Sequence, residues 1–233
     1  MNEISFLDLI GLEDIRGQLF RYLVCQPFID ITKTDVNITM IVILFVCKDL
    51  KTMFELYLET KSEKVYHPNK GQICEQAAFF GRIELLQWTR DIGYQWDSFT
   101  CSRAAFNGHL EVLKWAHKNG CEWDRSTCAW AASRGHLEVL KWAHKNGCAW
   151  DSWTCSNAAE NGHLEVLKWA RENGCEWNSC TCASAAGGGH LEVLKWARAH
   201  GCPWDIFTIR YAEMNKHTHV LNWAREQGCP FDN

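Results

Sequence analysis

The sequence predicts an all-α fold: a solenoid of stacked helix pairs, preceded by a small helical N-terminal segment. Three observations predict it. The tripeptide Gly-His-Leu recurs every 27 residues, starting at Gly108, Gly135, Gly162 and Gly189. Most of the 13 Trp and 13 Cys residues fall into series of the same period, and nothing in the repeats alternates with a period of two residues. Such a period, repeated more than three times, is typical of a solenoid whose units are stable only when stacked.

Residues 1–69 lie outside the repeat. Apolar residues three or four positions apart predict one helix over about 13–24, and an apolar stretch predicts a second over about 39–57. The polar segment 61–70, which contains Pro68, is the expected junction with the repeats.

Six units follow and form the predicted domain 70–233. The register of the tripeptide extends back to Gly81 and forward to Lys216. The predicted units are 70–96, 97–123, 124–150, 151–177, 178–204 and 205–231.

The unit 124–150 shows why two helices are expected in each repeat. Thr127 precedes an Ala-rich stretch and is the expected N-cap of the first helix. In the second helix, Glu138 and Lys141 form a favourable pair of opposite charge on the exposed side. Gly147 is expected to follow the end of that helix in the left-handed conformation. Each helix has only about two or three turns, so stacking must stabilise it.

The motif that begins at Ala131-Ala132 resembles the second half of an ankyrin repeat. It reads Ala-Ala-x-x-Gly-His-Leu-Glu-Val-Leu-Lys and is followed by Gly147-Cys-Ala-Trp-Asp151. The resemblance covers residues 70–231 and implies an ankyrin-type solenoid whose first helices line a concave surface. The unit is shorter than the ankyrin length of about 33 residues. The missing residues fall before Thr154, where ankyrins project a β-hairpin finger, so shortened hairpin loops are expected. This Trp- and Cys-rich form is similar to ankyrin repeats of some large DNA viruses and protists.

The recurring Trp, Cys and His residues are interpreted as structural. One Trp series lies on the second helix and is expected to be buried: Trp88, Trp115, Trp142, Trp169, Trp196 and Trp223. A second series is expected to fill the seams between units: Trp96, Trp123, Trp150, Trp177 and Trp204. The Cys series are expected to be small buried thiols, and the tripeptide His residues to bond to the preceding turn. No metal or cofactor is expected, and a metal site built from the Cys and His series is the alternative.

Function is expected where the units differ. Three positions of the first helix, at offsets of 0, 4 and 7 residues, share one face and vary from unit to unit. Together with the position that follows, they form what we call the variable stripe, which contains the aromatic and Arg residues typical of interface hot spots. The residues expected to contact a partner are Phe99, Arg103, Phe106, Trp130, Arg134, Trp153, Asn157, Glu160, Phe207 and Tyr211. Drift at tolerant solvent positions is the alternative, and it explains Ser184 and Gly187.

Residues 1–69 have two interpretations. Leu12-Glu-Asp-Ile15, Leu19-Phe-Arg-Tyr-Leu23 and the stretch 41–48 resemble an F-box, the module that docks onto the Skp-type adaptor of cullin–RING ubiquitin ligases. That resemblance implies adaptor contacts from Leu12, Ile15, Leu19, Leu23, Val46 and Leu50. Alternatively, residues 39–60 form a degenerate repeat that caps the stack.

Composition and motifs exclude several classes of function. The 24 Lys and Arg and 28 Asp and Glu residues give a net charge of −4, so nucleic-acid binding is not expected. The apolar run 40–47 is too short to cross a membrane, and the N-terminus lacks the pattern of a secretory signal. No residue stands out as catalytic among the near-identical copies. We therefore expect an intracellular, cytoplasmic, non-enzymatic module that binds a protein partner, as a ubiquitin-ligase substrate receptor if residues 1–69 are F-box-like. A purely structural scaffold is the alternative.

Overall fold

The computed structural model describes residues 70–91 and 93–231. The helices predicted over 13–24 and 39–57, and the residues expected to contact an adaptor, lie outside this part of the chain. Within it, twelve α-helices alternate with short turns and there is no strand. In chain order the helices are α4 (Lys70–Phe79), α5 (Ile83–Asp91), α6 (Ser98–Phe106), α7 (Leu110–Lys118), α8 (Arg125–Ser133), α9 (Leu137–Lys145), α10 (Ser152–Glu160), α11 (Leu164–Glu172), α12 (Ser179–Gly187), α13 (Leu191–Ala199), α14 (Ile206–Met214) and α15 (Thr218–Glu226).

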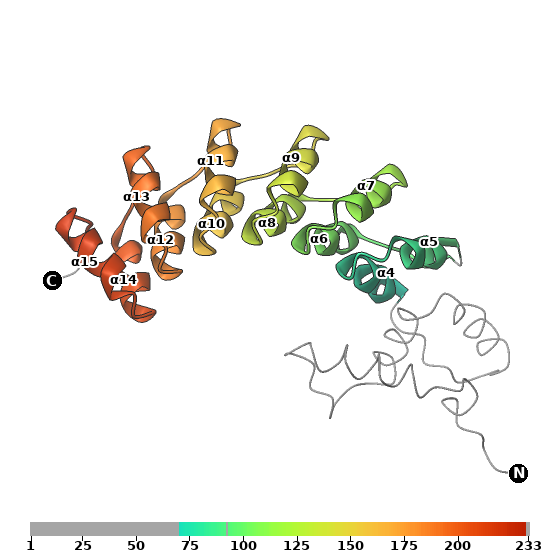
Figure 1. Ribbon diagram of the computed structural model, residues 1–233, viewed down its shortest axis with the longest axis horizontal. Helices are drawn as coiled ribbons and strands as arrows, with labels where there is room; N and C mark the ends of the chain where they lie inside the picture. The colour runs from blue at the N-terminus through green and yellow to red at the C-terminus, as the bar shows by residue number, and fades with distance from the viewer. Residues whose placement is uncertain (1–69, 92, 232–233) are drawn as a thin grey trace, which may run out of the picture. The chain divides into compact units, whose positions relative to one another are not determined.

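The helices lie in two rows (Figure 1). The inner row holds the first helix of each pair, α4, α6, α8, α10, α12 and α14, and each of these packs against the next. The outer row holds the second helices, and each packs on the first helix of its own pair. This arrangement confirms the predicted all-α solenoid of stacked helix pairs. Among the described helices, none is long and apolar enough to cross a membrane.

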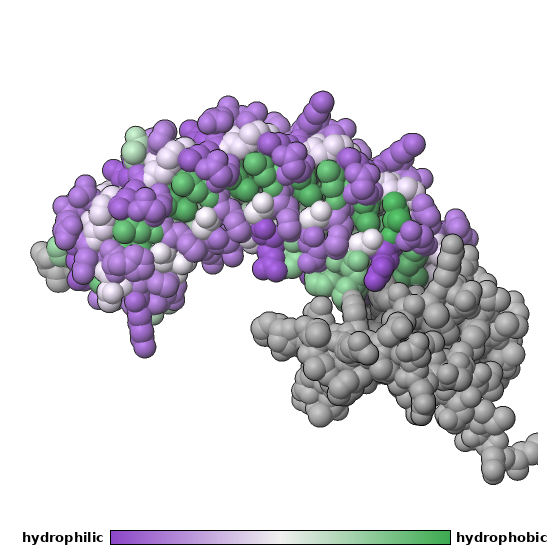
Figure 2. All heavy atoms as spheres, in the orientation of Figure 1, coloured by the Kyte–Doolittle hydropathy of each residue, from purple (hydrophilic) through white to green (hydrophobic). Residues whose placement is uncertain are grey.

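Small and medium-sized side chains form the core between and within the rows. The Ala pairs of the inner helices, such as Ala131 and Ala132, are fully buried, which lets these short helices lie close together. One Leu is also fully buried in each outer helix from α5 to α13: Leu86, Leu113, Leu140, Leu167 and Leu194. The equivalent residue of α15, Leu221, is 9% exposed. Figure 2 shows hydrophobic residues recurring along the row of repeats, between hydrophilic helix surfaces. The buried core therefore runs from unit to unit, as a solenoid requires.

The Trp series of the outer helices is less buried than expected. Trp88 is buried, but its five equivalents from Trp115 to Trp223 are only partly buried and pack on the outside of the core. The expectation of full burial is therefore wrong for these five. The reason is that Leu and Val side chains of the same helices already fill the space between the two rows.

The two Trp series meet at the seams between units, which confirms the seam-filling role predicted for Trp150 and its equivalents. The ring of Trp150 stacks on His144 at a centroid distance of 3.7 Å and meets Trp169 of the next unit edge-on at 5.7 Å. Where an Arg replaces the His, its guanidinium covers the seam ring instead, as Arg171 does at 4.2 Å from the centroid of Trp177. The remaining edge-on seam pairs are Trp96–Trp115, Trp123–Trp142, Trp177–Trp196 and Trp204–Trp223.

The N-caps of the inner helices differ from the prediction. Asp124 caps α8, because its carboxylate accepts a hydrogen bond from the backbone N–H of Ser126 at 2.8 Å. Thr127 lies inside the first turn, is fully buried, and donates its backbone N–H to the carbonyl of Asp124 at 3.0 Å. The assignment of Thr127 as N-cap is therefore wrong. The equivalent caps are Asp97, Asp151, Asn178 and Asp205.

The other local predictions for the unit 124–150 are confirmed. Gly147 has a φ of +86° just beyond the C-cap Asn146, in the left-handed region. Lys141 donates a hydrogen bond to Glu138 at 2.8 Å on the exposed side of α9.

In the unit 124–150, the cysteines of both series bond to the backbone of their own unit. The thiol of Cys148 donates to the carbonyl of Asp124 at 3.3 Å and so connects the turn after α9 to the N-cap of α8. Cys128 is fully buried, and its sulfur lies 3.9 Å from the carbonyl oxygen of Cys148. Hydrogen bonding to Cys148, together with burial, raises the pKa of the Cys128 thiol, which therefore stays protonated. These contacts confirm the small buried thiols that the series predicts.

The Gly-His-Leu tripeptide joins neighbouring units. His163 donates from Nε2 to the carbonyl of Ser133 in the preceding unit, at 3.1 Å. Its ring lies against Gly135, so close that a Cβ on Gly135 would lie 2.7 Å from Nδ1. Gly135 also has a φ of +75°. The predicted bond to the preceding turn is confirmed, and glycine is needed here both for its backbone conformation and for its small size.

Acidification from pH 7.5 to 5.5 is expected to lower the thermal unfolding midpoint. Burial lowers the pKa of His136 and His190, and the like charge of neighbouring His163 lowers it further. The hydrogen bond from each ring to a backbone carbonyl raises the pKa, but it does not outweigh burial. The unfolded chain binds protons below about pH 6.5, where the folded chain keeps these rings neutral. The contribution of these two His residues to the free energy of unfolding is therefore fully present above that pH. It is lost as the pH falls from there through the depressed pKa of the folded state.

Thermal scans of the full chain across this range check the expectation. His136→Gln should shrink the drop in the midpoint between pH 7.5 and 5.5, whatever it does to the midpoint itself. A midpoint that does not change over this range would contradict the titration of the buried His residues.

Candidate protein-binding surface

The variable stripe lies on the accessible face of the inner row. Trp153, Phe99 and Trp130 are 68%, 57% and 43% exposed, and Phe207 and Tyr211 are exposed as well. The remaining predicted contacts are exposed or partly buried: Arg103, Arg134 and Glu160 are exposed, and Phe106 and Asn157 are partly buried. The structure thus places nine of the ten residues on four inner helices, α6, α8, α10 and α14, and Arg134 at the C-cap of α8, whereas α12 contributes none of them.

An aromatic cluster forms the first part of the stripe, over α4, α6 and α8. The ring of Phe106 stacks with Phe79 at a centroid distance of 6.2 Å and meets Trp130 edge-on at 5.3 Å. The guanidinium of Arg134 lies 4.6 Å from the centroid of Phe106. Phe79 is not among the predicted residues, although extending the 27-residue register one unit back from Phe106 identifies it.

A hollow of about 350 Å³ forms the second part of the stripe, over α10, α12 and α14. We call it the α10–α14 hollow. Its walls include Trp153, Asn157 and Glu160 of α10 on one side and Phe207 and Tyr211 of α14 on the other. Its floor is formed by small residues of α12: Cys180, Ala183 and Ser184. The hollow exists because α12 carries small side chains where both of its neighbours carry large ones.

The α12 residues change the interpretation of the sequence pattern. Ser184 fits drift at a tolerant position when the unit 178–204 is considered alone. In the structure its small size opens the α10–α14 hollow, and Cys180 does the same one turn earlier. The sequence does contain a signal for the hollow. At the same positions of three consecutive units the side chains are large, then small, then large.

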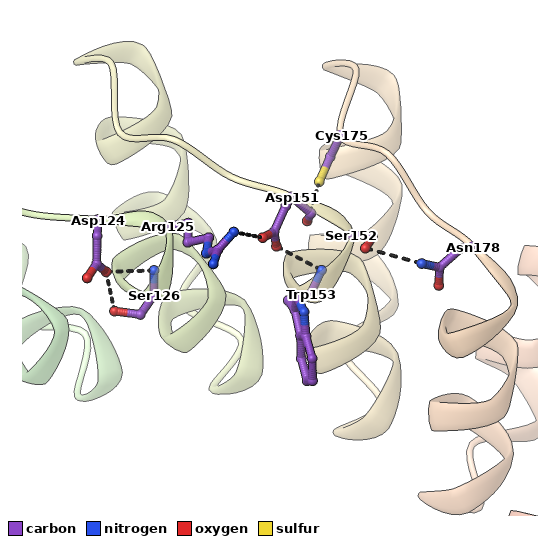
Figure 3. A network of polar contacts seen from close by, with 8 residues as sticks. All are labelled: Asp124, Arg125, Ser126, Asp151, Ser152, Trp153, Cys175 and Asn178. Atoms are coloured by element: carbon purple, nitrogen blue, oxygen red, sulfur yellow. Dashed lines mark hydrogen bonds and ion pairs between the residues drawn. The ribbon is translucent and has the colours of Figure 1, made fainter.

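A polar network fixes the backbone that carries Trp153 (Figure 3). The carboxylate of Asp151 accepts a hydrogen bond from the backbone N–H of Trp153 at 3.0 Å and forms an ion pair with Arg125 at 3.4 Å. Ser152 accepts a hydrogen bond from the side chain of Asn178 at 3.3 Å, which joins α10 to the N-cap of α12. The indole of Trp153 extends away from this network. The start of α10 is thus held from both neighbouring units, and the ring is presented from a rigid position.

The charged residues that line the α10–α14 hollow are both acidic. Glu160 and Asp205 are among the lining residues, and no Lys, Arg or His lines the hollow. The carboxylate of Asp205 caps α14 by accepting from the backbone N–H of Phe207 at 3.0 Å. Glu160 is exposed and forms no ion pair within the described part of the chain.

The cysteines of residues 70–91 and 93–231 are buried, with the exception of Cys180. Within residues 70–91 and 93–231, no three His, Cys, Asp or Glu side chains are grouped as metal ligands would be. Hydrogen bonding to neighbouring cysteines, and burial, raise the pKa of Cys101, Cys155 and Cys182, so these thiols stay protonated. Cys180 is the one exposed free cysteine of the described residues.

Comparisons with known proteins agree with this architecture. Residues 101–179 match the family model for ankyrin repeats (3 copies). The ankyrin repeat domain of human ASB11, a solved structure, aligns with a TM-score of 0.52 at 15% sequence identity, over 69% of this chain and 85% of that one. No curated protein matches the sequence.

The helix pairs, their stacking and the family match together define an ankyrin-repeat solenoid. The match of residues 101–179 identifies ankyrin repeats in the middle of the described unit, and it does not extend to residues 1–69. Domains built from ankyrin repeats are generally modules for protein–protein interaction and typically have no enzymatic activity.

Proposed function

We propose that this chain is an interaction module that holds a protein partner along the variable stripe. The observation that carries the proposal is the exposure of Trp130 and Trp153, at 43% and 68%, when every other Trp of the chain is at least partly buried. A solvent-exposed indole leaves a large apolar area in water, and burying it against a partner is favourable. Trp is also strongly enriched among the residues that dominate binding energy in interfaces.

The dimensions of the stripe suit a polypeptide. Helices that pack side by side lie about 8–10 Å apart, so six inner helices present a face roughly 50 Å long. The aromatic cluster around Phe106 and the α10–α14 hollow lie in different parts of this face. A partner that contacts both would bury an area typical of specific complexes, on the order of 800 Å² on each side.

Affinity purification from the native source, with the full chain as bait, tests the proposal. The double variant Trp130→Ala, Trp153→Ala should reduce capture of the partner at least about tenfold, because hot-spot Trp residues contribute about 2 kcal/mol or more each. Its free energy of unfolding should fall by only about 0.5–1.5 kcal/mol, because Trp130 forms one edge-on pair with Phe106 and Trp153 is exposed.

The matched control is Lys145→Ala with Glu172→Ala, two exposed positions at the ends of outer helices. It should capture the partner as the wild type does. Equal capture by the Trp double variant would point instead to a structural scaffold, and a large loss of stability would show that these Trp residues belong to the core.

A narrower role is substrate receptor of a cullin–RING ubiquitin ligase. It is supported by the F-box-like pattern of residues 12–50, with Leu23 as one of the expected adaptor contacts. The same purification tests it: the wild-type chain should retain a Skp-type adaptor, Leu23→Asp should lose the adaptor, and Trp153→Ala should keep it. Absence of the adaptor from the wild-type sample would refute this role and leave the interaction module unaffected.

A further inference from the structure

We infer that the α10–α14 hollow takes an arginine side chain of the partner polypeptide, held between the rings of Trp153, Phe207 and Tyr211 beside the carboxylate of Glu160. The inference rests on the proposed function and specifies the chemistry of its partner. It also assigns a role to the small residues of α12, which the variable stripe alone leaves unexplained.

The walls of the hollow provide aromatic faces for a flat cation. The rings of Phe207 and Tyr211 lie 5.9 Å apart, inclined by 50°, on the α14 side, and Trp153 stands on the α10 side. All three residues are more than 40% exposed, so most of their aromatic surface is accessible to a partner. A guanidinium is attracted to the face of Trp, Tyr or Phe by about 0.5–1 kcal/mol at an exposed site, and by more when water is excluded.

The chain itself repeatedly places a guanidinium over an aromatic ring. Arg90, Arg171 and Arg198 each lie 4.2 Å from the centroid of a seam Trp. Arg210 approaches Phe207, one of the hollow's own rings, with its guanidinium 5.8 Å from the centroid. The geometry that the inference requires is therefore one that these rings accept.

The electrostatics favour a cation over an anion or a neutral group. Glu160 and Asp205 are the charged lining residues, so the hollow attracts positive charge. Glu160 has no ion pair within the described residues, which leaves its carboxylate available to a partner. A guanidinium can make both contacts at once: its N–H groups donate to a carboxylate in its plane, and its face lies against an aromatic ring.

The floor and rim favour arginine over lysine. Guanidinium has five N–H donors in a fixed planar arrangement, and the ammonium of lysine has three. Asn157 donates its amide to the carbonyl of Ala129 at 3.4 Å, and its side-chain oxygen accepts no hydrogen bond from the described residues. Ser184 of the floor adds a hydroxyl that can accept a further N–H.

The volume of the hollow also fits one side chain. At about 350 Å³, it lies at the lower end of the range of small-molecule sites, about 300–1,000 Å³. A single extended side chain enters such a site and leaves its backbone outside, where it can continue along the inner row toward the aromatic cluster of Phe106 and Trp130.

The test uses the full chain and three small probes: N-acetyl-arginine amide, its neutral isostere N-acetyl-citrulline amide, and N-acetyl-lysine amide. Binding is followed by the indole N–H signal of Trp153 in ¹H–¹⁵N NMR spectra, assigned from its loss in Trp153→Phe. The rate of alkylation of Cys180 is a second readout, because this exposed thiol lies in the floor of the hollow. The arginine probe should shift the signal with a Kd on the order of millimolar and slow the alkylation.

The citrulline probe should bind at least about tenfold more weakly, because it lacks the charge, and the lysine probe should bind with intermediate affinity. Glu160→Gln should lower the affinity for the arginine probe about threefold, and Glu172→Gln on the outer row should leave that affinity unchanged. Equal affinity for citrulline, unchanged affinity in Glu160→Gln, or no shift at Trp153 would overturn the inference. If the Trp double variant still loses the natural partner in that case, the interaction module stands and only the arginine assignment falls.

Discussion

Replacing Gly135 by alanine is expected to lower the free energy of unfolding by about 2–5 kcal/mol. The left-handed φ of +75° costs a non-glycine residue about 1–2 kcal/mol. The new Cβ would also lie 2.7 Å from Nδ1 and 2.8 Å from Cε1 of His163, so the ring that joins two units must move. Forcing an atom into a packed contact costs typically about 1–3 kcal/mol more.

Gly147→Ala is the matched control. Gly147 has a similar φ of +86°, and a Cβ there would meet nothing within 4 Å. Its replacement should cost only the backbone term of about 1–2 kcal/mol. Urea unfolding of the two variants measures the difference, which is the contribution of the contact between units. Equal losses in both variants would refute a steric role for the His163 ring.

A double-mutant cycle locates the effect. Removing the ring in His163→Ala should relieve part of the penalty of Gly135→Ala, so the losses of the two changes should be less than additive. Fully additive losses would show that the two residues act independently.

Replacing Trp150 by alanine is expected to cost about 2–4 kcal/mol of unfolding free energy. The indole fills the seam between two units, stacked on His144 at 3.7 Å and edge-on to Trp169 at 5.7 Å. Each aromatic pair contributes about 0.5–1.5 kcal/mol beyond the apolar area that it buries. Because units of a solenoid are held together by such interfaces, the transition should also become less cooperative.

Trp153→Ala is the matched control for Trp150→Ala. The two residues lie three positions apart in the same junction, and Trp153 is 68% exposed. Its loss should change the unfolding free energy by no more than about 0.5 kcal/mol. Circular dichroism melts and urea curves of both variants give the comparison. A small effect at Trp150, or a large one at Trp153, would reverse the roles assigned to the seam and to the stripe.

Much of the fold could be predicted because its rules act within one unit or between identical neighbours. The Gly of the tripeptide and Gly147 indicate turns with a positive φ, which only glycine adopts readily. The fixed period indicates that every unit packs in the same way. The prediction fails where two local candidates compete. Thr127 and Asp124 are both good N-caps, and burial of the Thr hydroxyl in the core left the role to Asp124.

The candidate site was predictable in its large members and not in its small ones. Exposed aromatic and charged residues such as Trp153 and Glu160 stand out in a comparison of units. Ser184 and Cys180 do not, because a small side chain in one unit has no visible consequence until the larger side chains of both neighbours are placed around it.

The sequence by itself determined the repeat, the helix pairs and the face on which the units differ, because these follow from periodicity and from conformations local to a few residues. Only the tertiary structure decided how deeply the Trp residues of the outer helices are buried, which Gly contacts a His of the next unit, and where the stripe opens into a hollow. Those features depend on the shapes of side chains that belong to different repeat units, and these side chains meet only when short helices, unstable alone, stack.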